Sequence, residues 1–346
     1  LKRSNAFAIV AQECQAVRES VGLIDISGFS RYEVSGPGAK DWLRRLMAGR
    51  LPAAGRARLA PMLAPSGRLK GDLTVLNWGD GRWWVMGSYY LRNWHMRWFH
   101  DHQTEGVDVR DISDAVVGFG LAGPKSREVL AALTHQDVNG DALPFMGCAT
   151  VDVGLIRARV ARLSVCGELG YEINCESTEH IALREMLLQA GMAHEIREFG
   201  FYAMNSLRLE KSFGVWSAEF TQDRTPGMTG MDRWIDWSRN DFIGHDAAAK
   251  ARADNSAPQR LVTLEIDADD ADASGYEPIW QGEQRVGFVT SGGFGHYTGK
   301  SLAMGLLNNN VNEADEALMV DVVGKRRSAR TLSEPAWDPS GARMRL

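Results

Sequence analysis

The sequence predicts an α+β protein, with helices and strands interleaved over residues 1–250 and a small all-β domain over residues 251–346. Up to about residue 250, apolar residues at helical spacing alternate with short strand-like runs. After a segment rich in Ala, Asp, Asn, Ser and Pro at 250–260, short strand-like runs recur between turn residues. A chain of 346 residues is also too long for one ordinary core. We therefore expect these two parts to fold around separate cores.

The spacing of apolar residues fixes the expected elements in order. Helices are predicted over 6–21, 39–47, 90–102, 126–133, 179–190 and 201–210. Strands are predicted over 28–34, 83–86 and 116–121, with a hairpin over 61–76 that turns at Pro65-Ser66-Gly67. Residues 159–173 predict two further strand arms around a glycine-bounded turn. The last strands, over 261–266, 285–290, 301–307 and 318–323, suggest a small barrel.

Composition excludes several classes of function. The net charge is -5 without a Lys/Arg block, so we expect no nucleic-acid or membrane-surface partner. None of the four cysteines lies in a C-x-x-C pair or near a histidine at metal-ligand spacing, so no metal site is expected. So few cysteines suit a reducing compartment, and we expect the cytoplasm. Neither a membrane-length apolar run nor a signal peptide is visible.

Asp72 is the first candidate for chemistry. It follows Gly71 at the start of an apolar strand. One interpretation is a strand-edge aspartate that caps a turn. The other is a carboxylate held at the mouth of a site, where it acts on a proton or a cation. Gly71 favours the second, because glycine lets another group approach the backbone closely.

Glu172 is the second candidate. Strand periodicity places Tyr171 and Ile173 on one face and Glu172 on the other. That face is either exposed to solvent or directed at a ligand. A fixed carboxylate can accept two parallel hydrogen bonds from an N–H and an amino group side by side, as on a pterin ring.

Aromatic residues supply further candidates, which cluster at Trp83, Trp84, Tyr89, Tyr90, Trp94, Trp98 and Phe99. They either pack a core or line a cavity for a methylated cation, since aromatic faces attract ammonium groups. Tyr89 and Tyr90 follow the strand after Asp72 and are the substrate candidates. Trp216 either packs in a core or stacks on a planar ligand.

Taken in order, these segments resemble the aminomethyltransferase (glycine-cleavage T-protein) family along nearly the whole chain. The block Cys166-Gly167-Glu168-Leu169-Gly170-Tyr171-Glu172-Ile173 is similar to the family signature T-G-E-x-G-x-E-I. Further matching blocks lie at 36–39, 66–75, 121–126, 205–211, 241–247, 290–294 and 300–305. Within the family, residues 3–7, 13–19 and 337–345 resemble the folate-binding C-terminal half of dimethylglycine and sarcosine dehydrogenases and oxidases.

The resemblance implies a three-lobed, cloverleaf-like fold. Two interleaved, discontinuous α/β lobes with ferredoxin-like and Greek-key elements precede a C-terminal β-barrel. It implies that tetrahydrofolate binds in the centre, with Asp72 beside its reacting nitrogens and Glu172 on the pterin edge. It also implies folate contacts for Met62, Leu63, Tyr171 and Trp216.

The flavin of the related dehydrogenases has no expected site here, because the sequence lacks a G-x-G-x-x-G entry strand. Any flavin therefore lies on a separate chain or a missing segment. Two positions depart from the family: Val165 replaces a frequent tyrosine, and Met204 replaces an arginine of many T-proteins. Substrate handling is thus expected to differ from glycine cleavage.

We therefore expect an enzyme that moves a methylene group from an N-methylated amine to tetrahydrofolate, giving 5,10-methylenetetrahydrofolate. One alternative is a demethylase that moves an intact methyl group and gives 5-methyltetrahydrofolate. A second is a folate-binding protein without catalysis, against which the retention of Asp72 argues. A flavoprotein partner, or a fused flavin domain, is the expected source of the oxidised amine.

Overall fold

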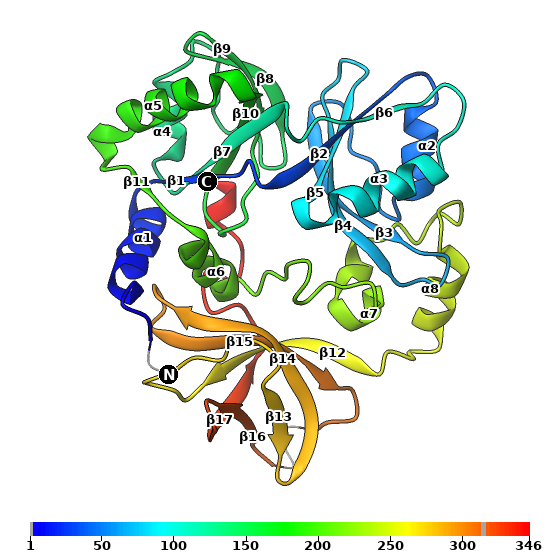
Figure 1. The fold of residues 1–346 in the computed structure, drawn as a ribbon, viewed down its shortest axis with the longest axis vertical. Coiled ribbons are helices and arrows are strands. Elements are labelled where there is room, and N and C mark those ends of the chain that lie inside the picture. The colour runs from blue at the N-terminus through cyan, green and yellow to red at the C-terminus, as the bar shows by residue number, and fades with distance from the viewer. Residues whose placement is uncertain (1–2, 313–315) are drawn as a thin grey trace.

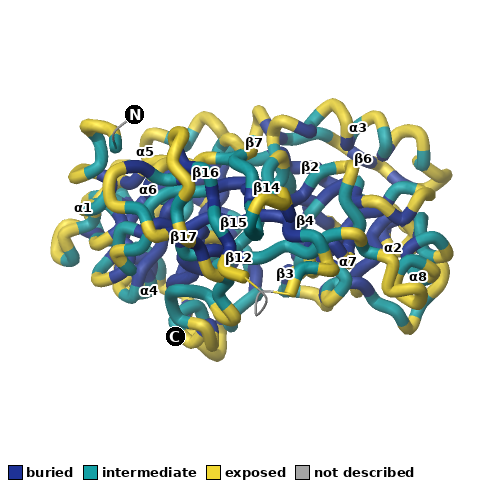
Figure 2. Tube along the Cα trace, turned by 90° about the horizontal axis from the view of Figure 1, so that it is seen from below, coloured by how far each residue is buried: buried dark blue, intermediate teal, exposed yellow. Residues whose placement is uncertain are grey.

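The computed structural model describes residues 3–312 and 316–346, which form three lobes around a common centre (Figure 1). Two lobes are helix-covered β-sheets, and the third is a closed barrel. Seen from below, the molecule is flattened, with buried segments inside each lobe and exposed segments on its outer side (Figure 2). This confirms the predicted α+β fold with a C-terminal barrel.

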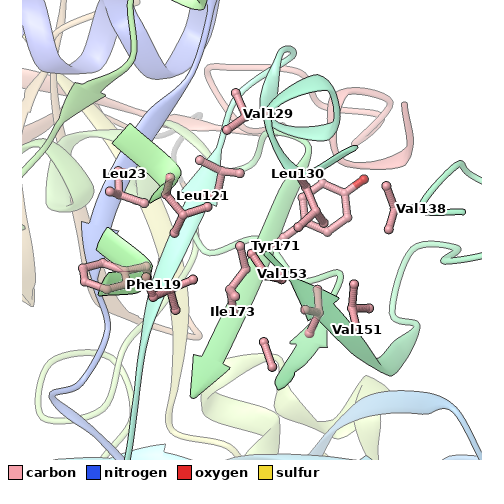
Figure 3. Packing of buried hydrophobic residues seen from close by; sticks show 14 of the residues in the cluster. Leu23, Phe119, Leu121, Val129, Leu130, Val138, Val151, Val153, Tyr171 and Ile173 are labelled. Carbon is pink, nitrogen blue, oxygen red and sulfur yellow. The ribbon is translucent and has the colours of Figure 1, made fainter. Parts of the chain in front are cut away.

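The first lobe is a six-stranded sheet in the order β11-β1-β7-β10-β9-β8. Its strands are β1 (Gly22–Asp25), β7 (Val116–Ala122), β8 (Cys148–Val153), β9 (Ile156–Ala161), β10 (Gly170–Glu176) and β11 (Arg197–Glu198). Helices α4 (Ser126–Ala131) and α5 (His180–Gly191) cover one face, and their apolar side chains share a core with the strands. Part of this core is drawn in Figure 3.

The second lobe is a five-stranded sheet in the order β3-β4-β5-β2-β6. Its strands are β2 (Phe29–Ser35), β3 (Arg56–Leu63), β4 (Leu69–Asn77), β5 (Trp83–Ser88) and β6 (Asp108–Asp111). Helices α2 (Ala39–Leu46) and α3 (Arg92–Asp101) bury one face, where Leu43 and Phe99 pack against Val75 and Val85.

The two sheet lobes are interleaved in sequence. Strand β1 ends just before β2 enters the five-stranded sheet, and the chain returns in β7, where Ala122 pairs with Gly22 of β1. The second lobe is thus inserted between two neighbouring strands of the first. The Ile26 amide donates a hydrogen bond of 2.9 Å to the Gly118 carbonyl, which holds the crossing segment on the first sheet.

The uncovered faces of the two sheets meet in a shared apolar cluster. Leu76, Trp84 and Met86 come from the five-stranded sheet, and Cys148 and Ala161 come from the six-stranded sheet. This cluster determines which side chains of each sheet point toward the other lobe.

The barrel closes in the order β12-β15-β14-β13-β16-β17. Its strands are β12 (Gln259–Ile266), β13 (Pro278–Gln281), β14 (Gln284–Gly295), β15 (Lys300–Asn308), β16 (Leu318–Val322) and β17 (Lys325–Leu332). Helix α6 (Phe201–Glu210) joins it to the first lobe, since the Ser206 hydroxyl donates to the Phe294 carbonyl at 2.8 Å. The remaining helices are α1 (Phe7–Glu19), α7 (Pro226–Thr229) and α8 (His245–Ala253).

The barrel contains six strands where four were expected, because β13 and β17 had no clear apolar pattern. The short strands β1, β6, β8 and β11 were also not expected. Across residues 3–312 and 316–346, every helix falls short of the length and apolarity that crossing a membrane requires.

Candidate active site

Asp72 lies on the face of the five-stranded sheet that is turned toward the first lobe. It pairs with Pro61 of β3 and stands two residues before Thr74, which is opposite Met86 of β5. Side chains two residues apart, or directly opposite, share a face of a sheet. Because Met86 packs in the cluster between the sheets, the half-buried Asp72 side chain belongs to the same face.

Glu172 lies on the corresponding face of the six-stranded sheet. It is opposite Ala161 of β9 and Gly120 of β7, and Ala161 packs in the cluster between the sheets. Its neighbours Tyr171 and Ile173 point to the other face and are buried under α4 and α5 (Figure 3). Asp72 and Glu172 therefore belong to the two surfaces that the sheets present to each other.

Both carboxyl groups are held in poorly solvated surroundings. Burial raises the pKa of Asp72 to about 7, and burial raises the pKa of Glu172 to about 7 against the opposing effect of Arg31. Within the part of the chain that the structure describes, neither carboxylate forms an ion pair. Carboxyl groups with raised pKa values are typical of functional sites.

One carboxylate oxygen of Glu172 indicates a position where a ligand can bind. Its Oε2 atom is buried and has no hydrogen-bond partner among the described residues. Buried polar atoms are nearly always hydrogen-bonded, so an orphaned acceptor calls for a donor from outside the chain. A pterin edge, which offers two parallel N–H donors to a carboxylate, fits this position.

Arg31 is the residue near this site that the sequence did not single out. It belongs to β2, is fully buried, and donates from Nε to Asn174 Oδ1 of β10 at 2.9 Å. Its positive charge also acts on Glu172, two residues before Asn174. Its only sequence signal is an arginine within a predicted strand.

Three of the predicted folate contacts are buried in cores. Tyr171 packs in the core of the first lobe, where its hydroxyl accepts a 3.1 Å hydrogen bond from Arg127 Nε. Met62 packs under α2 and α3, on the opposite side of the sheet from Asp72. Leu63 lies in a separate cluster, against which the half-buried Trp216 packs. Their folate contacts stay predictions, and their packing gives each a structural role.

The predicted aromatic patch is divided among several environments. Trp83 and Phe99 pack in the second lobe, Trp84 packs between the sheets, and the Lys70 ammonium lies 3.4 Å from the ring centre of Trp94. The two substrate candidates are exposed in a short 3₁₀ turn, Tyr89–Leu91. The Tyr89 hydroxyl accepts from Arg92 at 2.8 Å, and Tyr90 is 82% exposed. A substrate role for Tyr89 and Tyr90 stays a prediction.

Two open surface pockets, of about 360 and 630 Å³, lie elsewhere. The first is lined by Arg50, Arg58 and residues 233–238, and the second by Arg224, Arg285 and barrel residues. Neither includes Asp72 or Glu172. Arg224, which lines the second pocket, is half-buried and its Nη1 atom also has no hydrogen-bond partner among the described residues. We base the candidate site on the two carboxylates, because two groups with raised pKa values lie there beside the unpartnered oxygen of Glu172. In the described ranges, no cluster of three or more His, Cys, Asp or Glu side chains could hold a metal ion.

Comparison with known proteins agrees with the fold. Residues 2–239 match the GCVT N-terminal domain, and residues 259–338 match the glycine cleavage T-protein C-terminal barrel domain. The chain belongs to the glycine cleavage T-protein family.

Named relatives fall into two groups. The chain is 32% identical over its whole length to mitochondrial dimethylglycine dehydrogenase of Rattus norvegicus, of which it covers 41%. It is 28% identical over 96% of its length to aminomethyltransferase of Bacillus subtilis (strain 168), of which it covers 91%. The chain thus spans about two fifths of the dimethylglycine dehydrogenases and most of the aminomethyltransferase.

A solved structure supports the fold. Glycine cleavage system aminomethyltransferase T from Bartonella henselae superimposes with a TM-score of 0.85 at 23% identity, over 95% of this chain and 90% of that chain.

Proposed function

We propose that this protein is a tetrahydrofolate-dependent one-carbon transferase that takes a methylene group, at the iminium level, from an N-methylated amine and gives 5,10-methylenetetrahydrofolate. The observation that carries the proposal is the pair of carboxylates without an ion-pair partner on the facing surfaces of two sheets, with one oxygen of Glu172 left without a donor. Membership of the T-protein family supports the same chemistry.

Glu172 is the proposed anchor for the pterin. As a carboxylate it accepts two parallel hydrogen bonds from the ring N–H and the exocyclic amino group. Ligand donors would replace the missing partner of Oε2 and favour the ionised form of a group whose pKa burial has raised to about 7.

Asp72 is the proposed catalytic residue. Tetrahydrofolate supplies the nucleophilic nitrogen that takes up the one-carbon unit. An iminium donor carries positive charge, and the Asp72 carboxylate stabilises that charge in poorly solvated surroundings. With a pKa of about 7, the same carboxylate can accept a proton near neutral pH as the product forms.

The source of the oxidised amine is proposed to be a flavoprotein, either a partner chain or a segment fused to this one. Dimethylglycine dehydrogenases, of which this chain matches about two fifths, are the relatives that suggest it. The proposed donor is accordingly a small N-methylated amine. A reducing, cytoplasmic location is proposed from the cysteines, all four of which are free and buried.

Two amide variants test the two roles separately. Glu172→Gln should weaken tetrahydrofolate binding in calorimetry by about tenfold or more, since losing a charge-assisted hydrogen bond costs about 1.5–3 kcal/mol. Asp72→Asn should bind folate within a few-fold of the native protein but lose most turnover. Unchanged affinity in Glu172→Gln would remove the pterin assignment, and unchanged turnover in Asp72→Asn would remove the catalytic assignment.

The product distinguishes the proposal from its alternatives. Native protein supplied with methylated amines and a flavoprotein oxidant should release 5,10-methylenetetrahydrofolate. Release of 5-methyltetrahydrofolate without an oxidant would identify a demethylase. Folate binding without either product across candidate donors would identify a non-catalytic binder.

A further inference from the structure

Among the described residues, the positive charge that acts on Glu172 comes from Arg31 on the other sheet. Arg31 is fully buried in β2 of the five-stranded sheet, whereas Glu172 belongs to β10 of the six-stranded sheet. Burial lowers the pKa of Arg31, and the charge of Glu172 opposes that effect. Each group thus favours the charged form of the other across the boundary between the lobes.

Arg31 is also fixed by hydrogen bonds that leave it little freedom. Its Nε donates to Asn174 Oδ1 at 2.9 Å, and its two terminal nitrogens donate to the carbonyls of Phe29 and Ile26 at 3.0 Å each. Its own amide donates to Ser113 Oγ at 2.9 Å. The guanidinium therefore joins the crossing segment between β1 and β2 to the strand that carries Glu172.

The hydrogen bonds of Arg31 go to residues other than Glu172. Asn174, not Glu172, is its partner on β10, so Glu172 Oε2 stays free for a ligand while the positive charge remains close. A direct ion pair would have occupied the acceptor that the pterin needs. We propose that Arg31 is a positioning residue for Glu172, which aligns β10 through Asn174 and keeps the carboxylate charged and unoccupied for the ligand. This inference rests on the proposed function.

The other charged or titratable groups around Glu172 pair with other residues or lie on the opposite face of the sheet. Arg159 of β9 shares its face, opposite Asn174, but is paired with Asp80 at 2.6 Å. Asp25 at the end of β1 is 3.1 Å from His180. Cys175 lies on the opposite face, and burial raises its pKa to about 11. Arg31 is the cation that offsets the burial of Glu172.

The test separates the charge of Arg31 from its hydrogen bonds. Arg31→Met removes both, Arg31→Gln removes the charge but keeps a donor, and Arg31→Lys keeps the charge with fewer donors. Arg208→Met is the matched control, because Arg208 is a buried arginine of α6 whose partner is Glu219. The titration of Glu172 is followed in the folate-free protein by carboxyl NMR, with Glu172→Gln to assign the signal.

Arg31→Met and Arg31→Gln should move the titration midpoint of Glu172 upward by a pH unit or more. Arg31→Lys should leave it near that of the native protein, and Arg208→Met should leave it unchanged. Tetrahydrofolate affinity should then fall about fivefold at pH 7 in Arg31→Gln and recover at pH 9, since moving the midpoint from about 7 to about 8 lowers the ionised fraction of Glu172 at pH 7 from about one half to about one tenth.

Two results would overturn the inference. One is a Glu172 midpoint that is the same in Arg31→Gln as in the native protein. The other is an affinity loss that is equal at pH 7 and pH 9, which would indicate a purely structural role. Because the titration needs no folate, failure of the native protein to bind folate would count against the proposed function and not against this inference.

Discussion

The two proposed site carboxylates lie where they lower the stability of the fold. Burial raises the pKa of both to about 7, far above the value of about 4 expected in the unfolded chain. The folded state therefore binds more protons than the unfolded state between pH 4 and pH 7, and the free energy of unfolding falls as pH rises through that window. Carboxyl groups that lower the stability of a fold in this way are typical of functional sites.

Replacing either carboxyl group by an amide should therefore raise the free energy of unfolding at neutral and alkaline pH. The full pKa change corresponds to at most about 4 kcal/mol for one carboxyl, and partial exposure reduces the expected gain to about 1–2 kcal/mol. Asp72→Asn and Glu172→Gln should thus match the native protein in urea denaturation near pH 4.5 and exceed its stability by that amount at pH 8. Glu185→Gln, on the exposed side of α5, is the control that should show no gain. Equal stability of the amide variants and the native protein at pH 8 would show that the carboxylates are well solvated.

Residue patterns predicted the carboxylates but not their surroundings. Asp72 and Glu172 stand out because each is a charge within an apolar strand. In this strand the apolar Tyr32 and Val34 point to one face and Arg31 points to the other. Such alternation is equally typical of an arginine that faces solvent. Only the second sheet, whose position no local pattern gives, makes Arg31 a buried residue. The same alternation explains why Tyr171, next to Glu172, points into the opposite core.

Helices and strands whose apolar residues recur at regular spacing were predictable from the sequence. Strands whose conformation depends on pairing with neighbouring strands were not. The predicted helix over 6–21 corresponds to α1 (Phe7–Glu19), and the predicted hairpin over 61–76 corresponds to β3 and β4. Strand β17 reads Lys-Arg-Arg-Ser-Ala-Arg-Thr-Leu and has no apolar run, yet it pairs with β16 and β12. Its conformation comes from the closed barrel, since strand propensity depends on neighbouring strands.

The strands β7 and β10 pair so closely that we expect position 118 of β7 to require a glycine. A Cβ atom at Gly118 would lie 2.5 Å from the Ile173 carbonyl oxygen and 2.9 Å from Asn174 Oδ1. Because the first of these atoms is backbone, Gly118→Ala should separate the strands and cost about 1–3 kcal/mol in urea denaturation. Gly28→Ala is the control, since a Cβ atom there meets nothing within 4 Å. Equal stability of the two variants would mean that β10 moves without cost.

The first lobe and the barrel are joined through buried ion pairs around α6. Arg18 of α1 pairs with Glu168 at 3.0 Å and with Glu210 of α6 at 2.7 Å, and all three side chains are fully buried. Arg208 of α6 pairs with the buried Glu219 at 3.2 Å. Such pairs add little to stability compared with apolar packing, but removing one partner leaves an uncompensated buried charge. The first lobe or the barrel should therefore loosen from α6 where such a pair is broken.

Glu219 gives the sharpest test at this scale, because its carboxylate ties α6 to the barrel. It accepts hydrogen bonds from Thr290 at 2.7 Å and Ser291 at 2.5 Å, both in β14. Glu219→Ala should cost about 3–5 kcal/mol and raise hydrogen exchange in β14, while amides of β10 keep their protection. Glu283→Ala is the matched control, because that carboxylate pairs with Arg326 but is 92% exposed, and such a pair contributes about 0–1 kcal/mol. If exchange rose equally in β14 and β10, the lobes would unfold as one unit. Selective exchange in β14 would instead show that the barrel can loosen while the Glu172 strand stays folded.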